Sequence, residues 1–490
     1  MAERALGSEE RGDGSAGHGR ERYATAAFRR GSAAWSEHGA IRSAFLAILA
    51  LALAARLALA LAAAPDHIGG DPGVYDQVAV ALADGHGWSR PGRAPGVFKP
   101  TALHPPAWPA VLGAAYATTD HEDRPDLAGV RVRHAELAAR SLATAQARWR
   151  TGRVVNALLE TAGVALIGLI ALELWGRRMA LLAAAVAALY PALAVLGMAL
   201  LSEPLFVALE LGAVYAALRA RRGRLAWTAA AGVLCGLAVL ARANGAVLLV
   251  PLALAVPRRA IPVLLAGAVL AVAPWTLRNL TVLHAPVPVS TDLGQTLAGT
   301  YNPVAAANRF RWRNTRRLPP QDRPALRRPT EAERSAALTR DGLRYLGAHP
   351  ADAGLATLWN TARLLELDPS AREALAGEVQ SRSLAAVAIG GFALLAALAL
   401  PGAFTRRARA APRWLWLVPL LLWAGTVPFA VNFSRFRAPI DPFLVLLAAL
   451  TPAAAAPRVR RAAGWRPRRR RPRGRAAAPA AAPAPLPPRR

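Results

Sequence analysis

The sequence predicts an all-α polytopic membrane protein with about 10 transmembrane helices, cytoplasmic N- and C-termini and two large extracytoplasmic loops. Hydrophobic residues make up 54% of the 490 residues and charged residues only 18%. The mean hydropathy is +0.26. The apolar residues are gathered in runs of about the length that crosses a hydrocarbon layer of about 30 Å as a helix. This pattern excludes a disordered chain and an ordinary water-soluble enzyme.

Ten apolar runs are candidate spans. The first, residues 43–64, contains Arg56, whose side chain is expected to face the protein interior or to reach back to the membrane surface. The run at residues 245–257 is the weakest candidate, because it is closer in length to a re-entrant segment than to a full span. The others are residues 154–174, 179–200, 204–218, 225–241, 261–277, 384–400, 414–429 and 439–456.

The arginines set the expected orientation, because short cytoplasmic connections are enriched in Lys and Arg. If all ten runs cross, the short outer connections carry at most one arginine, whereas each inner connection carries at least two. The outer ones are residues 202–203 and 242–244, and the inner ones are residues 175–178, 219–224, 258–259 and 406–413. Two long loops then lie outside the cytoplasm, at residues 65–153 and 278–383. Within the first, residues 104–116 are expected to form a short helix at the membrane interface.

The tails differ from the membrane domain at residues 43–457. Residues 1–42 are polar and predict a disordered cytoplasmic tail, and residues 458–490 predict a second one, rich in Arg, Pro and Ala. The net charge of +30 would suggest nucleic acid as the partner of a soluble protein. Here the arginines lie mostly at the ends of apolar runs and in the tails, so we expect no nucleic acid. We expect the C-terminal tail to bind anionic lipids instead. The single cysteine, Cys235, is expected to be a packing residue.

The sequence places its polar groups at the outer ends of the spans and leaves the span centres nearly bare of charge, which favours a site at the external face. Asp71 follows two glycines just after the first span, and Tyr75 lies on the same face of a short helix that Gly85 ends. An alternative interpretation is that Asp71 caps this helix, with Pro72 at its first position.

Several other polar residues are expected at the same face. An acid near several cations suits a substrate with a membrane-embedded phosphate and a hydroxyl that must lose its proton. The alternative for the arginines is contact with lipid headgroups. These residues are Lys99 and His104 in the first loop, Glu203 before one span, Arg278 at the end of another, and Arg435 and Arg437 before the last.

Six segments in this order carry a resemblance to a known class of enzymes: GGDPGVYDQVAVALADGHGW, TALHPPAWPAVLGAAYA, ALYPALAVLGMALLSEPLF, GLAVLARANG, PWTLRN with VPVSTDLGQTLAGTYNP, and RFRAPIDPF. The chain resembles the GT-C class of integral-membrane glycosyltransferases, in the branch of the dolichyl-phosphate-mannose protein mannosyltransferases and the bacterial aminoarabinose transferases. The tails and much of residues 118–150 and 309–340 lie outside the resemblance. One departure is that Pro72 follows Asp71 where the mannosyltransferases often have a paired Asp-Glu, which argues against a protein acceptor.

The resemblance implies transfer of a sugar, with inversion, from a polyprenyl-phosphate donor to a glycan, lipid or protein acceptor at the extracytoplasmic face of the plasma membrane. It implies that Asp71 is the catalytic base or orients the acceptor, and that Glu203 matches an acidic position of the class. Arg435 and Arg437 match the positions that would hold the leaving phosphate. Further candidates for the phosphate or the acceptor are Lys99, Arg278, His104 and Tyr75.

The chemistry agrees with these roles. The leaving phosphate oxygen is weakly basic, so it needs charge neutralisation by arginine more than protonation. The acceptor hydroxyl needs a base, and partial desolvation is expected to raise the pKa of Asp71 toward a useful value. The sequence contains scattered carboxylates and no ligand cluster. We therefore expect no obligatory metal cofactor, although a divalent metal is compatible with the class.

Other functions remain open from the sequence. A transporter or flippase of a lipid-linked sugar precursor would use the same arginines without a base, although no internal repeat supports it. An oligosaccharide polymerase or ligase would share the spans but not the segment around Asp71. A purely structural anchor would leave the polar residues of the outer face unexplained.

Overall fold

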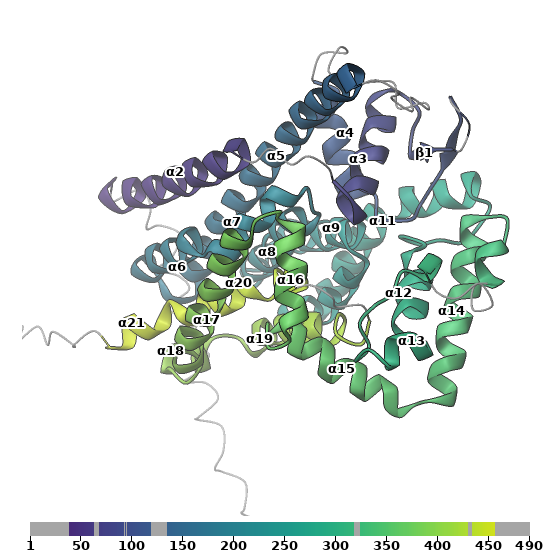
Figure 1. Cartoon of the computed structure of the whole chain (residues 1–490). Helices are drawn as coiled ribbons and strands as arrows, with labels where there is room; N and C mark the ends of the chain where they lie inside the picture. Colours follow the sequence, from purple (N-terminus) through teal and green to yellow (C-terminus); the bar gives the residue numbers. More distant parts are fainter. Residues whose placement is uncertain are drawn as a thin grey trace, which may run out of the picture. The chain divides into compact units, whose positions relative to one another are not determined.

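Almost all of the described chain is helical (Figure 1). The computed structural model describes residues 39–62, 68–92, 94, 96–118, 135–317, 324–429 and 434–455. The helices are α2 (Gly39–Ala62), α3 (Gly70–Ala83), α4 (Ala107–Tyr116), α5 (Ala135–Trp175), α6 (Arg177–Leu189), α7 (Pro191–Leu196), α8 (Glu203–Ala220), α9 (Leu225–Ala241), α10 (Leu249–Ala255), α11 (Ile261–Val282), α12 (Asp292–Thr300), α13 (Pro303–Ala306), α14 (Glu331–Ala348), α15 (Ala351–Leu364), α16 (Pro369–Glu378), α17 (Arg382–Ala403), α18 (Arg406–Ala410), α19 (Arg413–Ala424), α20 (Asp441–Ala448) and α21 (Leu450–Ala455). Strands β1 (Ser89–Pro91) and β2 (Phe98–Pro100) form an antiparallel hairpin.

Four of the described helical segments are long and apolar enough to cross a membrane: α2, Thr144–Trp175 of α5, Arg258–Val282 around α11, and α17. The bent pair Arg177–Leu189 and Pro191–Ala199 makes a fifth if it is one span. An all-α membrane protein is therefore what this architecture supports. Each of the ten predicted runs contains helix. The number of crossings and the side on which the termini lie stay predictions.

Local sequence explains where these helices break. Pro191 has no backbone N–H and cannot continue the hydrogen-bond ladder of α6, and the helix axis turns by 50° there. Gly176 ends α5 with a φ of 86°, a backbone conformation that glycine adopts at little cost. Both of these breaks therefore lie at a residue that disfavours a continuous helix.

Small residues let α9 pack closely on α11. A Cβ atom on Gly232 would lie 2.1 Å from the backbone oxygen of Leu264, and one on Gly236 would lie 2.5 Å from that of Ala268. Such close approach is typical of helix packing in membranes. Cys235 lies between the two glycines and is fully buried, as expected for a packing residue. The packing fixes the end of α9, from which Arg242 projects.

The expectation that the span centres are nearly bare of charge is wrong for α2, α5 and α8. Arg56 is 2% exposed, and its Nε lies 3.5 Å from Oε2 of Glu160 on α5. Its guanidinium also donates to the carbonyl oxygens of Ala187 and Ala188. Arg56 therefore faces the protein interior. Glu210 on α8 is fully buried as well.

The described residues of the first predicted outer loop, 65–153, form α3, the β1–β2 hairpin, α4 and the first part of α5. The hairpin pairs Arg90 with Lys99 and was not predicted from the sequence. Helix α4 confirms a helix within residues 104–116, beginning only after Pro105 and Pro106. Its expected place at the membrane interface stays a prediction.

The predicted tails lie almost entirely outside the described residues. Residues 39–42, assigned to the N-terminal tail, instead begin α2. The described residues from 39 to 454 belong to one unit by their internal contacts. The lipid-binding role of the C-terminal tail and the boundaries of the membrane domain stay predictions.

Candidate functional site

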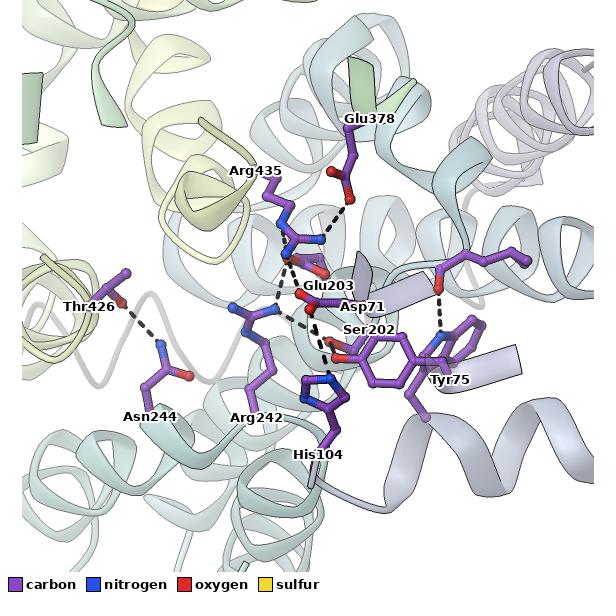
Figure 2. A network of polar contacts seen from close by, with 12 residues as sticks. Asp71, Tyr75, His104, Ser202, Glu203, Arg242, Asn244, Glu378, Thr426 and Arg435 are labelled. Carbon is purple, nitrogen blue, oxygen red and sulfur yellow. Dashed lines mark hydrogen bonds and ion pairs between the residues drawn. The ribbon is translucent and has the colours of Figure 1, made fainter. Parts of the chain in front are cut away.

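Six segments far apart in the sequence bring polar side chains together at one place (Figure 2). We call this group the Asp71–Arg435 cluster. Its members are Asp71 and Tyr75 from α3, His104 before α4, Ser202 and Glu203 at the start of α8, Arg242 at the end of α9, Glu378 at the end of α16 and Arg435 in the 3-10 helix η8 (Ser434–Arg437).

Arg435 is the centre of the cluster. Its side chain is 4% exposed and forms ion pairs with three carboxylates. Nη1 lies 2.8 Å from Oε1 of Glu378, Nε lies 3.6 Å from Oε1 of Glu203, and Nη2 contacts Oδ2 of Asp71. Burial alone would lower the pKa of Arg435, but the three carboxylates together raise it. One buried cation thus joins α3, α8 and α16.

Asp71 is the accessible member of this ion-pair group. Its side chain is 39% exposed, whereas that of Glu203 is 1% exposed. Burial of the carboxylate would raise the pKa of Asp71, but Arg435 and then His104 outweigh it and lower the pKa to about 2. The expectation of a raised pKa is therefore wrong, because the sequence does not reveal the tertiary pairing with Arg435. Asp71 is ionised at neutral pH and is a weak base in this state.

The capping interpretation of Asp71 is also wrong. The N-cap of α3 is Gly69, which provides no side-chain cap, and Asp71 lies inside the first turn. Gly70 begins the helix with a φ of 61°, a conformation that favours glycine. The two glycines turn the chain so that the Asp71 carboxylate reaches Arg435.

Tyr75 and His104 form one wall beside Asp71. Nε2 of His104 lies 3.8 Å from Oδ1 of Asp71, and its ring centroid lies 5.1 Å from that of Tyr75. The Tyr75 hydroxyl lies 3.4 Å from Oγ of Ser202. Burial and the negative charge of Asp71 raise the pKa of Tyr75, so its hydroxyl keeps its proton. The predicted residues Asp71, Tyr75, His104, Glu203 and Arg435 are thus brought together.

Arg242 and Glu378 belong to the site but were not predicted. Nη1 of Arg242 lies 2.8 Å from Oε1 of Glu203 and 3.3 Å from Oγ of Ser202. Neither oxygen of Glu203 accepts a well-aligned hydrogen bond from the described residues. A buried carboxylate in this condition can accept hydrogen bonds from the hydroxyls of a bound ligand. Arg242 could have been predicted, because it lies in GLAVLARANG, one of the segments that carry the resemblance. Glu378 lies in no such segment.

Two long-range contacts hold the segment that carries His104. Arg278 donates from Nη1 to the carbonyl oxygen of Thr101, at 3.1 Å, and from Nη2 to that of Trp88, at 2.8 Å. The Glu331 carboxylate accepts from Oγ1 of Thr101, at 2.7 Å, and from the backbone N of Ala102, at 2.9 Å. Arg278, a predicted phosphate ligand, therefore lies apart from Asp71 and fixes the first loop.

We expect Glu331→Ala to destabilise the protein by about 2 kcal/mol, because several donors lose a charged acceptor. We also expect sugar transfer to weaken, since the position of His104 depends on this contact. Glu333→Ala, two residues later on the same helix, removes an exposed capping side chain and should cost about 1 kcal/mol or less. Thermal unfolding of both variants compares the two losses. Equal losses would contradict a special role for Glu331.

Arg437 and Lys99 are not part of the cluster. Arg437 is 3% exposed, and its three nitrogens donate to Oδ1 of Asp441, at 2.9 Å, to Oε1 of Glu366, at 3.1 Å, and to the carbonyl oxygen of Leu364, at 2.7 Å. A donor phosphate would have to displace these acceptors. Lys99 is exposed on β2. Their predicted roles at the phosphate stay predictions.

Asp292 at the start of α12 is a further acid within electrostatic reach of the cluster. Burial raises its pKa, and the charges of His104, Asp71, Arg242 and Arg435 act on it as well. Within the part of the chain that the structure describes, no group of three His, Cys, Asp or Glu side chains is arranged to hold a metal ion. The expectation that no divalent metal is obligatory stays a prediction.

The sequence model of the family described as dolichyl-phosphate-mannose-protein mannosyltransferase matches residues 137–288. This region runs from α5 to the end of α11 and includes Glu203 and Arg242. This match confirms, for residues 137–288, the resemblance to the GT-C class that the motifs indicate. No curated protein sequence matches the chain.

Solved structures similar to the chain include the archaeal oligosaccharyltransferase AglB from Archaeoglobus fulgidus in complex with an inhibitory peptide and a dolichol-phosphate. The identity is 14% and the TM-score 0.48, over 86% of this chain and 51% of that one. The apo form of the Archaeoglobus fulgidus oligosaccharyltransferase matches at 13% identity and a TM-score of 0.48, over 84% and 50%. The chain spans about half the length of these structures.

Proposed function

We propose that the chain is a membrane glycosyltransferase that moves a sugar from a polyprenyl-phosphate donor to an acceptor hydroxyl at the extracytoplasmic face of the plasma membrane. The observation that carries the proposal is the Asp71–Arg435 cluster, in which an accessible carboxylate is held against a buried cation. The family match over residues 137–288 supports glycosyl transfer from a lipid-phosphate donor. The apolar helices support a multi-pass membrane protein.

In the proposed reaction, Asp71 orients the acceptor hydroxyl and takes its proton as the hydroxyl oxygen bonds to the anomeric carbon, because that bond makes the proton acidic enough for a weakly basic carboxylate. The hydroxyl oxygen forms a bond to the anomeric carbon, and the bond from that carbon to the phosphate oxygen breaks with inversion. The polyprenyl phosphate leaves with the bonding electron pair. Glu203 and Tyr75 support the acceptor or the sugar through hydrogen bonds.

Arg435 has a positioning role in this scheme. Its charge is already matched by three carboxylates, so it keeps Asp71 ionised and fixed in place. The sequence-based proposal that Arg435 binds the leaving phosphate requires the phosphate to displace one of these carboxylates. Arg435→Lys, which keeps the charge but not the three-way geometry, separates the two roles. A positioning role predicts a lower kcat with little change in donor affinity.

One feature favours a transporter or flippase of a lipid-linked sugar precursor as the second candidate. Broken helices are typical of transporters, and α6 and α7 form such a pair, bent by 50°. The test uses the full-length protein in liposomes with radiolabelled polyprenyl-phosphate sugars. Transfer of the label to an acceptor supports the transferase. Movement of intact donor across the bilayer without transfer supports the transporter.

A further inference from the structure

A large cavity lies directly beside the Asp71–Arg435 cluster. Its volume is about 490 Å3, within the range of small-molecule sites. Gly70 and Pro72, the residues on either side of Asp71, line it, and so does Glu378, which pairs with Arg435. The cavity therefore adjoins the cluster at Glu378 and at the two chain neighbours of Asp71, although Asp71 itself does not line it.

Part of the cavity lining is apolar and comes from the ends of long apolar helices. Leu59 and Ala62 lie at the end of α2, and Leu384 lies near the start of α17. Both helices are long and apolar enough to span a membrane. A hydrocarbon chain could thus lie along this wall while its head reaches the cluster.

Arg153, on α5, lines the same cavity and is 1% exposed. Its Nε donates to the carbonyl oxygen of Trp149, at 3.3 Å, whereas its Nη1 has no hydrogen-bond acceptor among the described residues. A buried guanidinium without a carboxylate partner is costly, and its unsatisfied nitrogen calls for an explanation such as a ligand.

Arg153 differs in this respect from the other buried arginines of the described chain. Each of those forms an ion pair with at least one carboxylate, whereas no described carboxylate pairs with Arg153. The paired arginines are Arg56, Arg148, Arg363, Arg435 and Arg437. Arg153 is therefore the buried arginine that can accept an anion without displacing a carboxylate.

We propose that this cavity binds the phosphate end of a polyprenyl-phosphate lipid, with the Arg153 guanidinium holding the phosphate and the apolar wall holding the first part of the hydrocarbon chain. The proposal rests on the proposed function and names the cation that neutralises the leaving group. Glu378 is already paired with Arg435, and Arg153 is the cation that lines the cavity. The sugar then lies toward Asp71.

The test measures binding of a tritiated long-chain polyprenyl monophosphate to the full-length protein in phosphatidylcholine nanodiscs. Arg153→Met removes the charge and keeps most of the side-chain volume, Arg153→Lys keeps the charge, and Arg150→Met is the matched control. Arg150 lies on the same helix and is exposed. We expect Arg153→Met to weaken binding at least about tenfold, the loss of a hydrogen bond to a charged group, and Arg153→Lys to weaken it less. Arg150→Met should bind as the wild type does.

A structural role for Arg153 predicts a different result. Because its charge is buried without a described carboxylate partner, Arg153→Met should unfold at the same or a higher temperature than the wild type when no lipid is bound. A lower unfolding temperature together with weaker binding would overturn the proposal. Unchanged binding by Arg153→Met would overturn it as well.

Competition identifies the ligand chemistry. Displacement of the label by unlabelled polyprenyl phosphate, but not by equal concentrations of inorganic phosphate or phosphatidylglycerol, supports the proposal. Displacement by inorganic phosphate or by phosphatidylglycerol at similar concentrations would overturn the lipid assignment. The two proposals fail separately: Arg153-dependent binding without sugar transfer contradicts only the glycosyltransferase, and sugar transfer without Arg153-dependent binding contradicts only this inference.

Discussion

Asp71→Asn is expected to reduce sugar transfer by about 10²–10⁴-fold, the range that a general base contributes. Asparagine has nearly the same shape and still accepts a hydrogen bond from Arg435, but it cannot take the acceptor proton. Glu203 and Glu378 continue to pair with Arg435, so the fold should persist. Donor binding should change little. Initial rates of transfer and donor affinity, measured on the same preparation, check this.

Asp84→Asn is the matched control, because Asp84 lies at the other end of α3 and is exposed. It should keep the wild-type rate. The pH dependence adds a second check. The pKa of Asp71 is about 2, below its ordinary value, so the carboxylate stays ionised as the pH falls to about 4. Protonation of Asp71 should therefore not lower kcat/KM at any pH above about 4. A limb between pH 5 and 7 that Asp71→Asn removes would contradict this environment.

Arg435→Met is expected to be the most destabilising substitution in the cluster, by about 3 kcal/mol, because it removes the buried cation that joins three carboxylates. Glu378 loses its ion pair, and Asp71 keeps only the weaker contact with His104. Transfer should fall as well, since Asp71 is no longer fixed. Arg382→Met, an exposed position at the start of α17, is the control and should be nearly neutral.

The pH dependence of Arg435→Met follows from the same charges. Burial already raises the pKa of Glu378, and without Arg435 it should raise the pKa of Asp71 too. Carboxylates with a raised pKa in the folded state stabilise it at low pH and lose that contribution as the pH rises. The difference in the free energy of unfolding between the wild type and Arg435→Met should therefore become smaller as the pH falls from about 8 to about 5. Thermal unfolding across this range measures it, and a deficit that is independent of pH would contradict the ion-pair account.

The sequence predicts the helices well because apolar runs, prolines and glycines act locally. Gly176 lies between the predicted runs 154–174 and 179–200, whereas the break at Pro191 falls inside the second run and was not predicted. Part of the site is also predictable, since Asp71 and Arg435 stand in recognisable segments next to spans. Burial and pairing are not local properties. The ion pair of Arg435 with Glu378 joins residues 57 positions apart, and nothing near either one in the sequence indicates it.

The wrong expectations have the same origin. The pKa of Asp71 was expected to rise because burial was considered without its partner, and the ion pair with Arg435 reverses the sign. Arg56 was placed in the first apolar run, but its pairing with Glu160 was not predicted, because the two residues lie in different runs and meet only in the folded protein. The sequence does not show that Arg153 lacks a described carboxylate partner, because this follows only from the ion pairs of the folded protein.

In the proposed reaction, the Asp71–Arg435 cluster promotes cleavage of the bond between a sugar and a lipid phosphate. The most direct measurement is the release of free polyprenyl phosphate from a radiolabelled polyprenyl-phosphate sugar by the purified full-length protein, with and without added acceptor. We predict that release depends on the acceptor, that one polyprenyl phosphate appears for each sugar transferred, and that Asp71→Asn prevents both. Donor that binds and crosses the bilayer but is recovered intact, equally with the wild type and Asp71→Asn, would contradict the account.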